Sequence, residues 1–378
     1  MDDLKAVFLY SPEWDKINYP QGCPFDTGRA GKTRSTLKSM GILGGSHQRE
    51  VVPAKATRSE MERFHKPEYL DAIKNAEKGI LPPGAFAMGI GTPDCPVFHG
   101  MYEYASLASG ASITGARMIL SGEANIVFNP SGGFHHAGPA KASGFCYVND
   151  VVLAAMELTV AKKSVLFLDM DVHHGDGVQS AFYERDDIMT VSLHESGKTL
   201  YPGTGFENEI GRGKGEGYSI NIPLPVGTYD NAYKRAFREA ALPLIHKFNP
   251  DVLIIELGMD ALSGDPLAHL QLTNNTFVDI IKEILKLNKP ILATGGGGYN
   301  VAASVRSWAL LWSVLCGEDD HDMGIGLGGV MLETTDWLGG LRDRVLITDA
   351  GIRDTVDADI NRVIAAIRER VFPLHSLL

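Results

Sequence analysis

Two short segments of the chain combine histidines and aspartates in patterns that suit metal binding and proton transfer. Residues 132–136 read GGFHH and residues 168–177 read LDMDVHHGDG, so together they hold four histidines and three aspartates. Imidazole and carboxylate groups are the side chains that bind divalent ions and exchange protons near neutral pH. The two segments therefore predict a centre in which a metal ion lies beside acid–base groups.

Asp171 and His173 have the spacing of a pair of metal ligands. They are two residues apart after an apolar run, so at the end of an extended strand their side chains would point the same way and could share one cation. A single histidine is more often a surface or core residue. Glycines cluster around both segments, however, and glycine lets the backbone approach a site closely. The whole set favours a functional site.

The adjacent histidines also have candidate carboxylate partners. Asp169 and Asp176 are available to accept hydrogen bonds from His135 and His136. Such a carboxylate orients an imidazole and makes it more basic. We therefore expect two tuned imidazoles next to the metal.

The elements that must position these residues alternate along the chain. Short apolar or β-branched runs read as strands at 6–9, 125–128, 164–168, 188–193, 218–222, 252–256 and 290–293. Helical patterns occur at 101–120, 148–161, 177–183, 229–247, 275–287 and 302–316. This alternation predicts an α/β fold with a single open, mostly parallel sheet flanked by helices. No linker or repeat interrupts the pattern, so we expect one domain spanning residues 1–378.

The candidate polar residues follow four different predicted strands. His135 and His136 come after 125–128, Asp171 and His173 after 164–168, Asp260 after 252–256, and Tyr299 after 290–293. Open parallel sheets bind ligands beyond the carboxyl ends of their strands. The sequence therefore predicts an active site at that edge of the sheet.

Asp260 and Tyr299 complete the predicted site. With Asp171 and His173, Asp260 gives two carboxylates and one imidazole, which leaves room for water and substrate as a catalytic zinc site requires. Tyr299 lies in TGGGGYN, residues 294–300, which lacks the glycine patterns of phosphate-binding loops. Its hydroxyl is better explained as a donor to a developing oxyanion.

Composition limits the classes of partner. Lysine and arginine number 35 and aspartate and glutamate 46, for a net charge of −11. This balance argues against general affinity for nucleic acid or anionic membranes and is compatible with a cationic substrate. Four scattered cysteines lack paired metal spacing and are expected to be reduced. No run approaches the roughly 20 apolar residues of a membrane span, and the N-terminus lacks a signal-peptide pattern, so we expect a cytoplasmic protein.

Long motifs in the chain resemble the histone deacetylase superfamily, including its bacterial acetoin-utilisation and deacetylase-like members. The motifs are residues 91–116, 130–150, 169–179 and 192–194, the segment around Asp260, and residues 295–300. The resemblance implies the arginase/deacetylase-like form of the open sheet. It also implies a metal-dependent amidohydrolase that removes acetyl or other short acyl groups from lysine side chains of proteins.

The resemblance implies bound cations of two kinds. A catalytic zinc ion, with iron(II) as the alternative, would be held by Asp171, His173 and Asp260. A structural potassium ion near it matches Asp169, Asp171, His173, Ser192 and Leu193. A second monovalent site, formed largely by backbone carbonyls, matches Phe182, Arg185, Ile188 and Tyr218.

The resemblance also implies catalytic roles. Tyr299 would polarise the substrate carbonyl, and His136 would act as general base and then as general acid. His135 would be its electrostatic neighbour, and Asp169 and Asp176 would support the pair. The reaction would be hydrolysis of an acyl amide, whose poor amine leaving group needs an acid as well as a metal.

Five further residues match a substrate tunnel. Asp94 matches a rim carboxylate that grips backbone amides of the substrate, and Gly144 and Phe145 match one wall. Tyr201 stands where many members have phenylalanine, so its hydroxyl changes the polarity of the tunnel. Leu267 matches an apolar position at the mouth, which favours a protein lysine over a polyamine because it offers no partner to a remote ammonium group.

Two other functions compete with this prediction. The first is another enzyme on the same fold, such as an acetylpolyamine hydrolase or an arginase-like ureohydrolase, whose two manganese ions need additional carboxylates. The second is a non-catalytic reader of acyl-lysine, which could dispense with Tyr299, His136 or a metal ligand, although none of them is missing. The sequence favours no particular oligomeric state.

Overall fold

A single parallel sheet forms the centre of the protein. The computed structural model describes residues 4–318 and 340–377. Eight strands pair in the order β2-β1-β3-β8-β7-β4-β5-β6, and every pairing is parallel. The strands are β1 (Ala6–Leu9), β2 (Gln48–Val51), β3 (Ile126–Asn129), β4 (Val165–Asp169), β5 (Ile188–Glu195), β6 (Ser219–Leu224), β7 (Val252–Glu256) and β8 (Ile291–Thr294).

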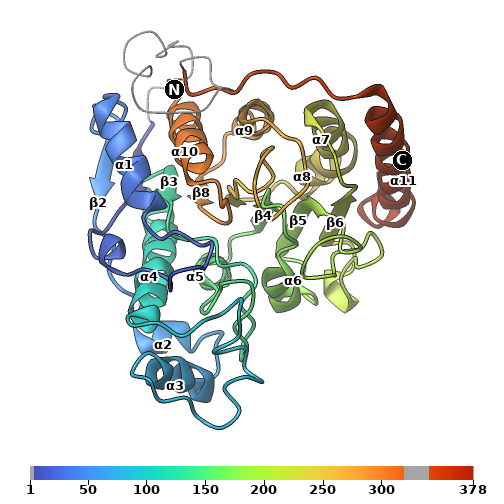
Figure 1. Ribbon diagram of the computed structural model, residues 1–378. Coiled ribbons are helices and arrows are strands. Elements are labelled where there is room, and N and C mark those ends of the chain that lie inside the picture. The colour runs from blue at the N-terminus through green and yellow to red at the C-terminus, as the bar shows by residue number, and fades with distance from the viewer. Residues whose placement is uncertain (1–3, 319–339, 378) are drawn as a thin grey trace.

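Helices cover both faces of the sheet, which explains why the central strands are nearly continuous apolar runs. In Figure 1, α7, α9 and α10 lie above the sheet and α4, α5 and α6 lie below it. The α-helices are α1 (Arg29–Ser39), α2 (Arg58–Met61), α3 (Pro67–Ala76), α4 (Met101–Leu120), α5 (Asp150–Val160), α6 (Asp176–Phe182), α7 (Asp230–Ala236), α8 (Leu242–Phe248), α9 (Asn274–Leu285), α10 (Val301–Leu315) and α11 (Ala350–Arg370). This architecture confirms the predicted fold class.

The strand order explains how distant segments come together. Strands β3, β8, β7 and β4 are consecutive neighbours in the sheet, and all point the same way. The loops that follow these four strands therefore meet at one edge. They are the loops in which the sequence places its candidate residues.

All seven predicted strands are present, with ends within two residues of those expected. The prediction missed β2, an edge strand whose sequence QREV is half polar and partly exposed. The predicted helix 229–247 is divided into α7, a π-helical turn (Phe237–Ala241) and α8. Four helices were not predicted from the sequence: α1, α2, α3 and α11. The last of them packs against the edge strand β6.

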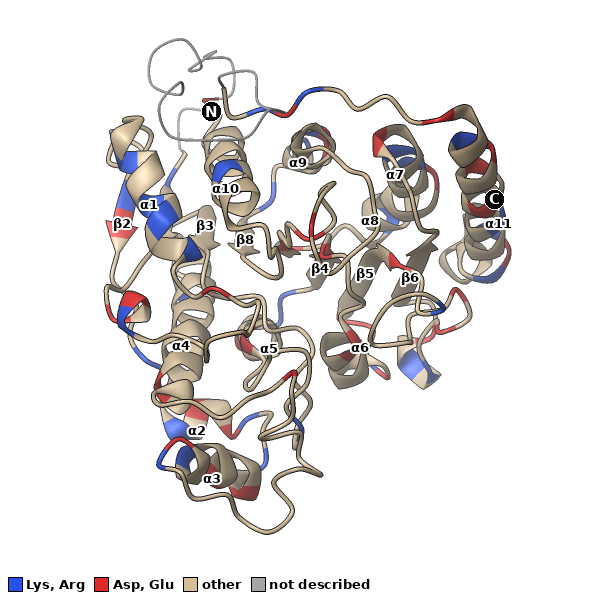
Figure 2. Cartoon of the chain, viewed as in Figure 1, with Lys and Arg blue, Asp and Glu red and all other residues tan. Residues whose placement is uncertain are grey.

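Charged residues are spread over the outer helices. Figure 2 shows basic and acidic residues interspersed on α7 and α11. Within residues 4–318 and 340–377, none of the helices is both long and apolar enough to cross a membrane.

Candidate active site

The loop after β3 holds the two adjacent histidines in fixed positions. Asp150, at the start of α5, is fully buried, and its carboxylate accepts hydrogen bonds from the backbone N–H groups of Gly133 (3.1 Å) and Phe134 (2.8 Å). Because these donors directly precede His135, the carboxylate fixes the turn that delivers the histidine pair. The sequence analysis missed this role for Asp150.

Each histidine contacts a different aspartate. Nδ1 of His135 lies 3.2 Å from Oδ2 of Asp169, and Nδ1 of His136 lies 2.7 Å from Oδ1 of Asp176. The Nε2 atoms of the two rings are 3.1 Å apart. A positive charge on the His135 ring therefore lowers the pKa of the His136 ring.

The two rings differ in basicity. Burial, aided by the charge of His135, lowers the pKa of His136 to about 4. Burial also opposes a charge on His135, but the carboxylates of Glu256 and Asp169 outweigh it and raise the pKa of His135 well above its ordinary value. The pair thus combines a neutral imidazole with a readily protonated one.

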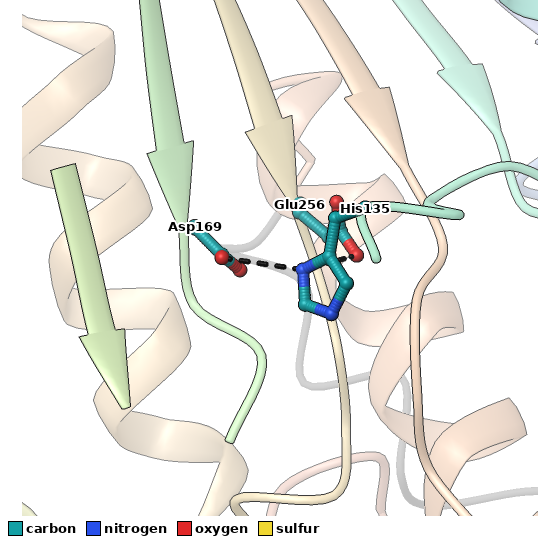
Figure 3. Close-up of side chains that lie close together, drawn as sticks. All are labelled: His135, Asp169 and Glu256. Atoms are coloured by element: carbon teal, nitrogen blue, oxygen red, sulfur yellow. Dashed lines mark hydrogen bonds and ion pairs between the residues drawn. The ribbon is translucent and has the colours of Figure 1, made fainter. Parts of the chain in front are cut away.

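Glu256 is a member of the site that the sequence analysis missed. Its Oε1 lies 3.1 Å from Nδ1 of His135, and the side chains of His135, Asp169 and Glu256 come from the loop after β3 and from the ends of β4 and β7 (Figure 3). Burial, and then repulsion from Asp169 and Asp171, raises the pKa of Glu256 well above its usual range. The sequence did hold a signal for Glu256, because a glutamate is the last residue of the otherwise apolar strand VLIIE.

The predicted metal ligands form a second buried group. Nδ1 of His173 lies 3.2 Å from Oδ1 of Asp171 and 3.1 Å from Oδ2 of Asp260. One potential ligand atom from each of the three residues lies within 4.8 Å of the others. Two carboxylates and one imidazole, all buried, form a donor set that suits a divalent ion. The residues present therefore fit a catalytic metal.

The way in which Asp171 and His173 meet differs from the sequence-based expectation. β4 ends at Asp169, so the two ligands lie in a loop rather than on a strand. The backbone N–H of His173 donates to Oδ1 of Asp171 (2.9 Å), which closes a tight turn and brings the side chains together. The other oxygen of Asp171 accepts a hydrogen bond from the backbone N–H of Gly297 (2.7 Å).

The glycine loop after β8 packs directly against the metal ligands. A methyl group built on Gly297 would lie 2.7 Å from Cγ of Asp260 and closer still to Oδ2, so only glycine fits. Arg29 is buried and donates hydrogen bonds of 2.9 Å to the carbonyls on either side, those of Gly296 and Gly298. The loop is therefore held in place from both sides.

Without a metal, the ligands compete for protons. Burial opposes the charge of His173, but hydrogen bonds to Asp171 and Asp260 raise its pKa to about 10. Burial and the nearby charge of Asp171 raise the pKa of Asp260 to about 7. Burial also opposes the charge of Asp171, but its hydrogen bond with His173 holds its pKa well below the usual range. A divalent cation would replace these shared protons.

Tyr299 lies beside the predicted metal ligands. Its ring centroid is 6.5 Å from that of His173 and 5.8 Å from that of Phe145. Its backbone N–H donates to Oδ2 of Asp265 (2.7 Å), a buried carboxylate that the sequence analysis did not identify. Burial raises the pKa of Tyr299 well above its ordinary value, so its hydroxyl keeps its proton.

Two aromatic residues and one glycine line the approach to the histidines. The ring of Tyr201 is 42% exposed and lies 5.2 Å from the ring of His136 and 6.4 Å from that of His173, centroid to centroid. Gly144 has φ +51°, and a methyl group on it would lie 3.0 Å from Cγ of His136 and closer to Cδ2. Phe145, which follows it, also has a positive φ of 63°.

The two remaining predicted substrate contacts, Asp94 and Leu267, lie in different loops. The carboxylate of Asp94 accepts a hydrogen bond from the backbone N–H of Gly144 (3.2 Å), so it is tied to the segment that holds Phe145. Leu267 is half-buried, and its backbone N–H donates to Oδ1 of Asp265 (2.9 Å). The carboxylate that holds the Tyr299 backbone thus also positions Leu267.

The predicted potassium ligands fall on two parts of the fold. At the first, Oγ of Ser192 donates to Oδ2 of Asp169 (3.1 Å), and these residues are partners in the pairing of β4 with β5, next to Leu193. At the second, the backbone N–H of Arg185 donates to the carbonyl of Phe182 (3.0 Å) between α6 and β5. Ile188 opens β5, and Tyr218 directly precedes the adjacent β6.

A family model and individual relatives both match this chain over most of its length. The family model described as "Histone deacetylase domain" matches residues 23–315. The acetoin utilization protein AcuC of Bacillus subtilis is 40% identical over 322 residues, which is 83% of each chain. Histone deacetylase 8 of Xenopus tropicalis is 36% identical over 320 residues, covering 84% of this chain and 85% of that protein.

Solved structures give the same result. The crystal structure of a histone deacetylase homolog complexed with SAHA superposes with a TM-score of 0.85 at 30% identity, covering 97% of this chain and all of that one. A homolog from Aquifex aeolicus gives a TM-score of 0.80 at 30% identity, covering 95% of this chain and all of the other. The chain belongs to the histone deacetylase family and is a deacetylase-type hydrolase.

Proposed function

We propose that this protein is a zinc-dependent deacylase, with iron(II) as the alternative metal, that removes acetyl or other short acyl groups from lysine side chains of proteins. The observation that carries the proposal is the buried group Asp171, His173 and Asp260 beside a histidine pair and Tyr299. A non-catalytic reader would not need all of these groups together.

His136 is the proposed general base and acid. When bound, a divalent ion supplies polarisation of the substrate carbonyl and a lowered pKa for water. The low pKa of His136 keeps its ring neutral and able to accept a proton from that water. Asp176, 2.7 Å from Nδ1, orients the ring, which would then return a proton to the leaving lysine amine. His135, supported by Asp169, completes the proposed pair.

Tyr299 is the proposed donor to the oxyanion. Its high pKa keeps the hydroxyl protonated at neutral pH, as a hydrogen-bond donor must be. Its backbone is fixed by Asp265, so the hydroxyl needs little reorganisation during the reaction. Removing the hydroxyl should therefore affect turnover more than substrate binding.

Residues at the mouth of the expected substrate tunnel support a peptide substrate over an acetylpolyamine, which is the second candidate substrate. Leu267 is apolar and half-buried, so it provides no charge for the remote ammonium of a polyamine. Asp94 would accept N–H groups of a peptide backbone, which a polyamine lacks. Gly144, Phe145 and Tyr201 would line the path of the acyl-lysine.

The residues around Ser192 and those around Arg185 are the proposed ligands of two structural potassium ions. Residues 1–378 form one proposed catalytic domain. The net charge of −11 supports an enzyme that acts on acylated proteins without a specific nucleic-acid partner. The proposed location is the cytoplasm, as expected from the sequence.

The test is a substrate panel. Initial rates should be compared for acetyl-lysine peptides, N-acetylspermidine and N-acetylputrescine, each over a range of concentrations. We expect a higher kcat/KM for the peptides. A polyamine preference of roughly tenfold or more, about 1.4 kcal/mol in transition-state binding, would replace the lysine proposal with the second candidate.

A further inference from the structure

A hydrogen bond joins two segments that both lie beside His136. The side-chain hydroxyl groups of Ser143 and Tyr201 share this bond, although the two residues are 58 positions apart in the sequence. Ser143 precedes Gly144, on which a methyl group would lie 3.0 Å from Cγ of His136. The ring of Tyr201 reaches the same histidine from another loop, with 5.2 Å between the two ring centroids. The bond therefore connects two segments that flank the proposed base.

The Ser143 end of this bond is fixed by the backbone. Ser143 and Cys146 exchange backbone hydrogen bonds of 3.0 Å and 2.8 Å, which close the turn between them. Asp94 holds the middle of the turn. Its carboxylate accepts a hydrogen bond from the N–H of Gly144 (3.2 Å), and its carbonyl accepts one from the N–H of Phe145 (2.9 Å). The hydroxyl of Ser143 is thus presented from a turn that has little freedom to move.

Tyr201 depends on its hydroxyl for its position. It lies in the loop that follows β5, and its side chain is 42% exposed. Within residues 4–318 and 340–377, neither the N–H nor the carbonyl of Tyr201 has a hydrogen-bond partner. Further along, the loop is fixed at Thr204, whose hydroxyl oxygen lies 2.9 Å from Nδ1 of His174. The bond with Ser143 is therefore the contact that orients the Tyr201 ring.

The Tyr201 ring lies where it would meet the acyl group of a substrate. Its centroid is 5.2 Å from that of His136, the proposed base, and 6.4 Å from that of His173, a proposed metal ligand. The proposed reaction needs the acyl carbonyl beside both imidazoles. A ring fixed at this place leaves less room for an acyl group that branches next to its carbonyl, and a pocket can discriminate against a single misplaced methyl group.

We propose that the hydrogen bond between Tyr201 and Ser143 is a specificity determinant, which holds the Tyr201 ring beside the reacting carbonyl and so disfavours acyl groups that branch next to it. This inference rests on the proposed deacylase function. Tyr201 would contact the acyl group, and Ser143 is a positioning residue that acts through Tyr201. Phenylalanine at position 201 lacks the hydroxyl, so its ring would be free to turn towards solvent.

The test compares two isomeric substrates. Peptides that carry isobutyryl-lysine or butyryl-lysine in the same sequence contain the same atoms and differ only in branching next to the carbonyl. The kcat/KM for each is measured with the wild type, Tyr201→Phe, Ser143→Ala and the double variant. We expect each single variant to raise the isobutyryl-to-butyryl ratio about three- to tenfold, the scale of one net hydrogen bond. The double variant should show no further increase, because both substitutions break the same bond.

Tyr229→Phe is the matched control. The hydroxyl of Tyr229, directly before α7, also joins two distant segments, because it donates to the carboxylate of Asp357 in α11, whose oxygens lie at 3.0 Å and 3.1 Å. This variant should leave the ratio unchanged. Thermal unfolding shows which variants are folded. Tyr201→Phe and Ser143→Ala break the bond from opposite ends, so either one that folds is enough to decide.

The possible outcomes separate this inference from the proposed function. An unchanged ratio in Tyr201→Phe or in Ser143→Ala overturns the inference and leaves the deacylase proposal intact. Single effects that multiply in the double variant, or equal kcat/KM for the two isomers in the wild type, do the same. If the wild type hydrolyses acylpolyamines rather than peptides, the ratio is measured with N-isobutyrylputrescine and N-butyrylputrescine, and the expected rise supports the inference although the lysine proposal has failed. A wild type that hydrolyses no acyl amide overturns both.

Discussion

Replacing Gly144 with alanine tests whether turnover depends on the position of the His136 ring. The new methyl group would lie 3.0 Å from Cγ and 3.1 Å from Nε2 of His136, and closer to Cδ2. Carbon atoms normally approach to about 3.5–4.0 Å. The ring must therefore move by up to about 1 Å, which strains its 2.7 Å contact with Asp176.

Two separate costs follow from this substitution. A shift of about 1 Å in a catalytic group can reduce turnover roughly 10²-fold, or about 2.7 kcal/mol in the barrier. The left-handed φ of +51° at Gly144 costs an alanine a further 1–2 kcal/mol or so of folding stability. The first cost should appear in kcat and the second in thermal unfolding.

Two glycine variants separate these costs. Gly84→Ala has a positive φ of 86° but no atom within 4 Å of the new methyl group, so it should lose stability and keep kcat. Gly138→Ala has no positive φ and meets only Lys141, at 3.8 Å or more, so it should lose neither. Deacetylation of an acetyl-lysine peptide measures kcat for all three. If Gly144→Ala stays within about threefold of the wild type, the ring position does not control turnover.

Three other predictions concern the metal and the substrate. Tyr299→Phe should fold normally and lower kcat by roughly 10² or more, the scale for one oxyanion donor, with little change in substrate binding; near-wild-type kcat would remove Tyr299 from the mechanism. In the metal-free protein the pKa of His173 is about 10 and that of Asp260 about 7. Metal binding at pH 7.5 should therefore release about one to two protons, and affinity should fall about tenfold or more per unit as pH decreases; calorimetry in two buffers that gives no proton release would contradict this. Leu267→Glu should shift the kcat/KM ratio towards acetylpolyamines, and an unchanged ratio would mean that the mouth does not select the substrate.

Much of the fold and the site could be predicted because two physical patterns are local. Central parallel strands are buried on both faces, so they read as apolar runs whatever their neighbours are. The carboxyl ends of such strands meet at one edge, which is why His136, Asp171 and Tyr299 could be grouped without knowledge of the strand order.

What the sequence could not show depends on tertiary contacts. Strand β2 is a partly exposed edge strand and therefore lacks the apolar signal of the central strands. Asp150 and Asp265 are ordinary acidic residues in the sequence, and only the folded chain shows that they are buried at the site. The pairing of Asp171 with His173 was expected for the wrong reason, since a turn rather than a strand brings them together.

Recovery of activity on metal addition tests whether the reaction depends on the metal bound at Asp260. The protein is stripped of metal, zinc is added in steps, and acetate release from an acetyl-lysine peptide is followed beside Asp260→Asn under the same conditions. We expect the stripped enzyme to be essentially inactive, activity to return as zinc binds, and Asp260→Asn not to recover. Hydrolysis by the stripped enzyme at the wild-type rate, or full recovery of Asp260→Asn, would contradict this expectation.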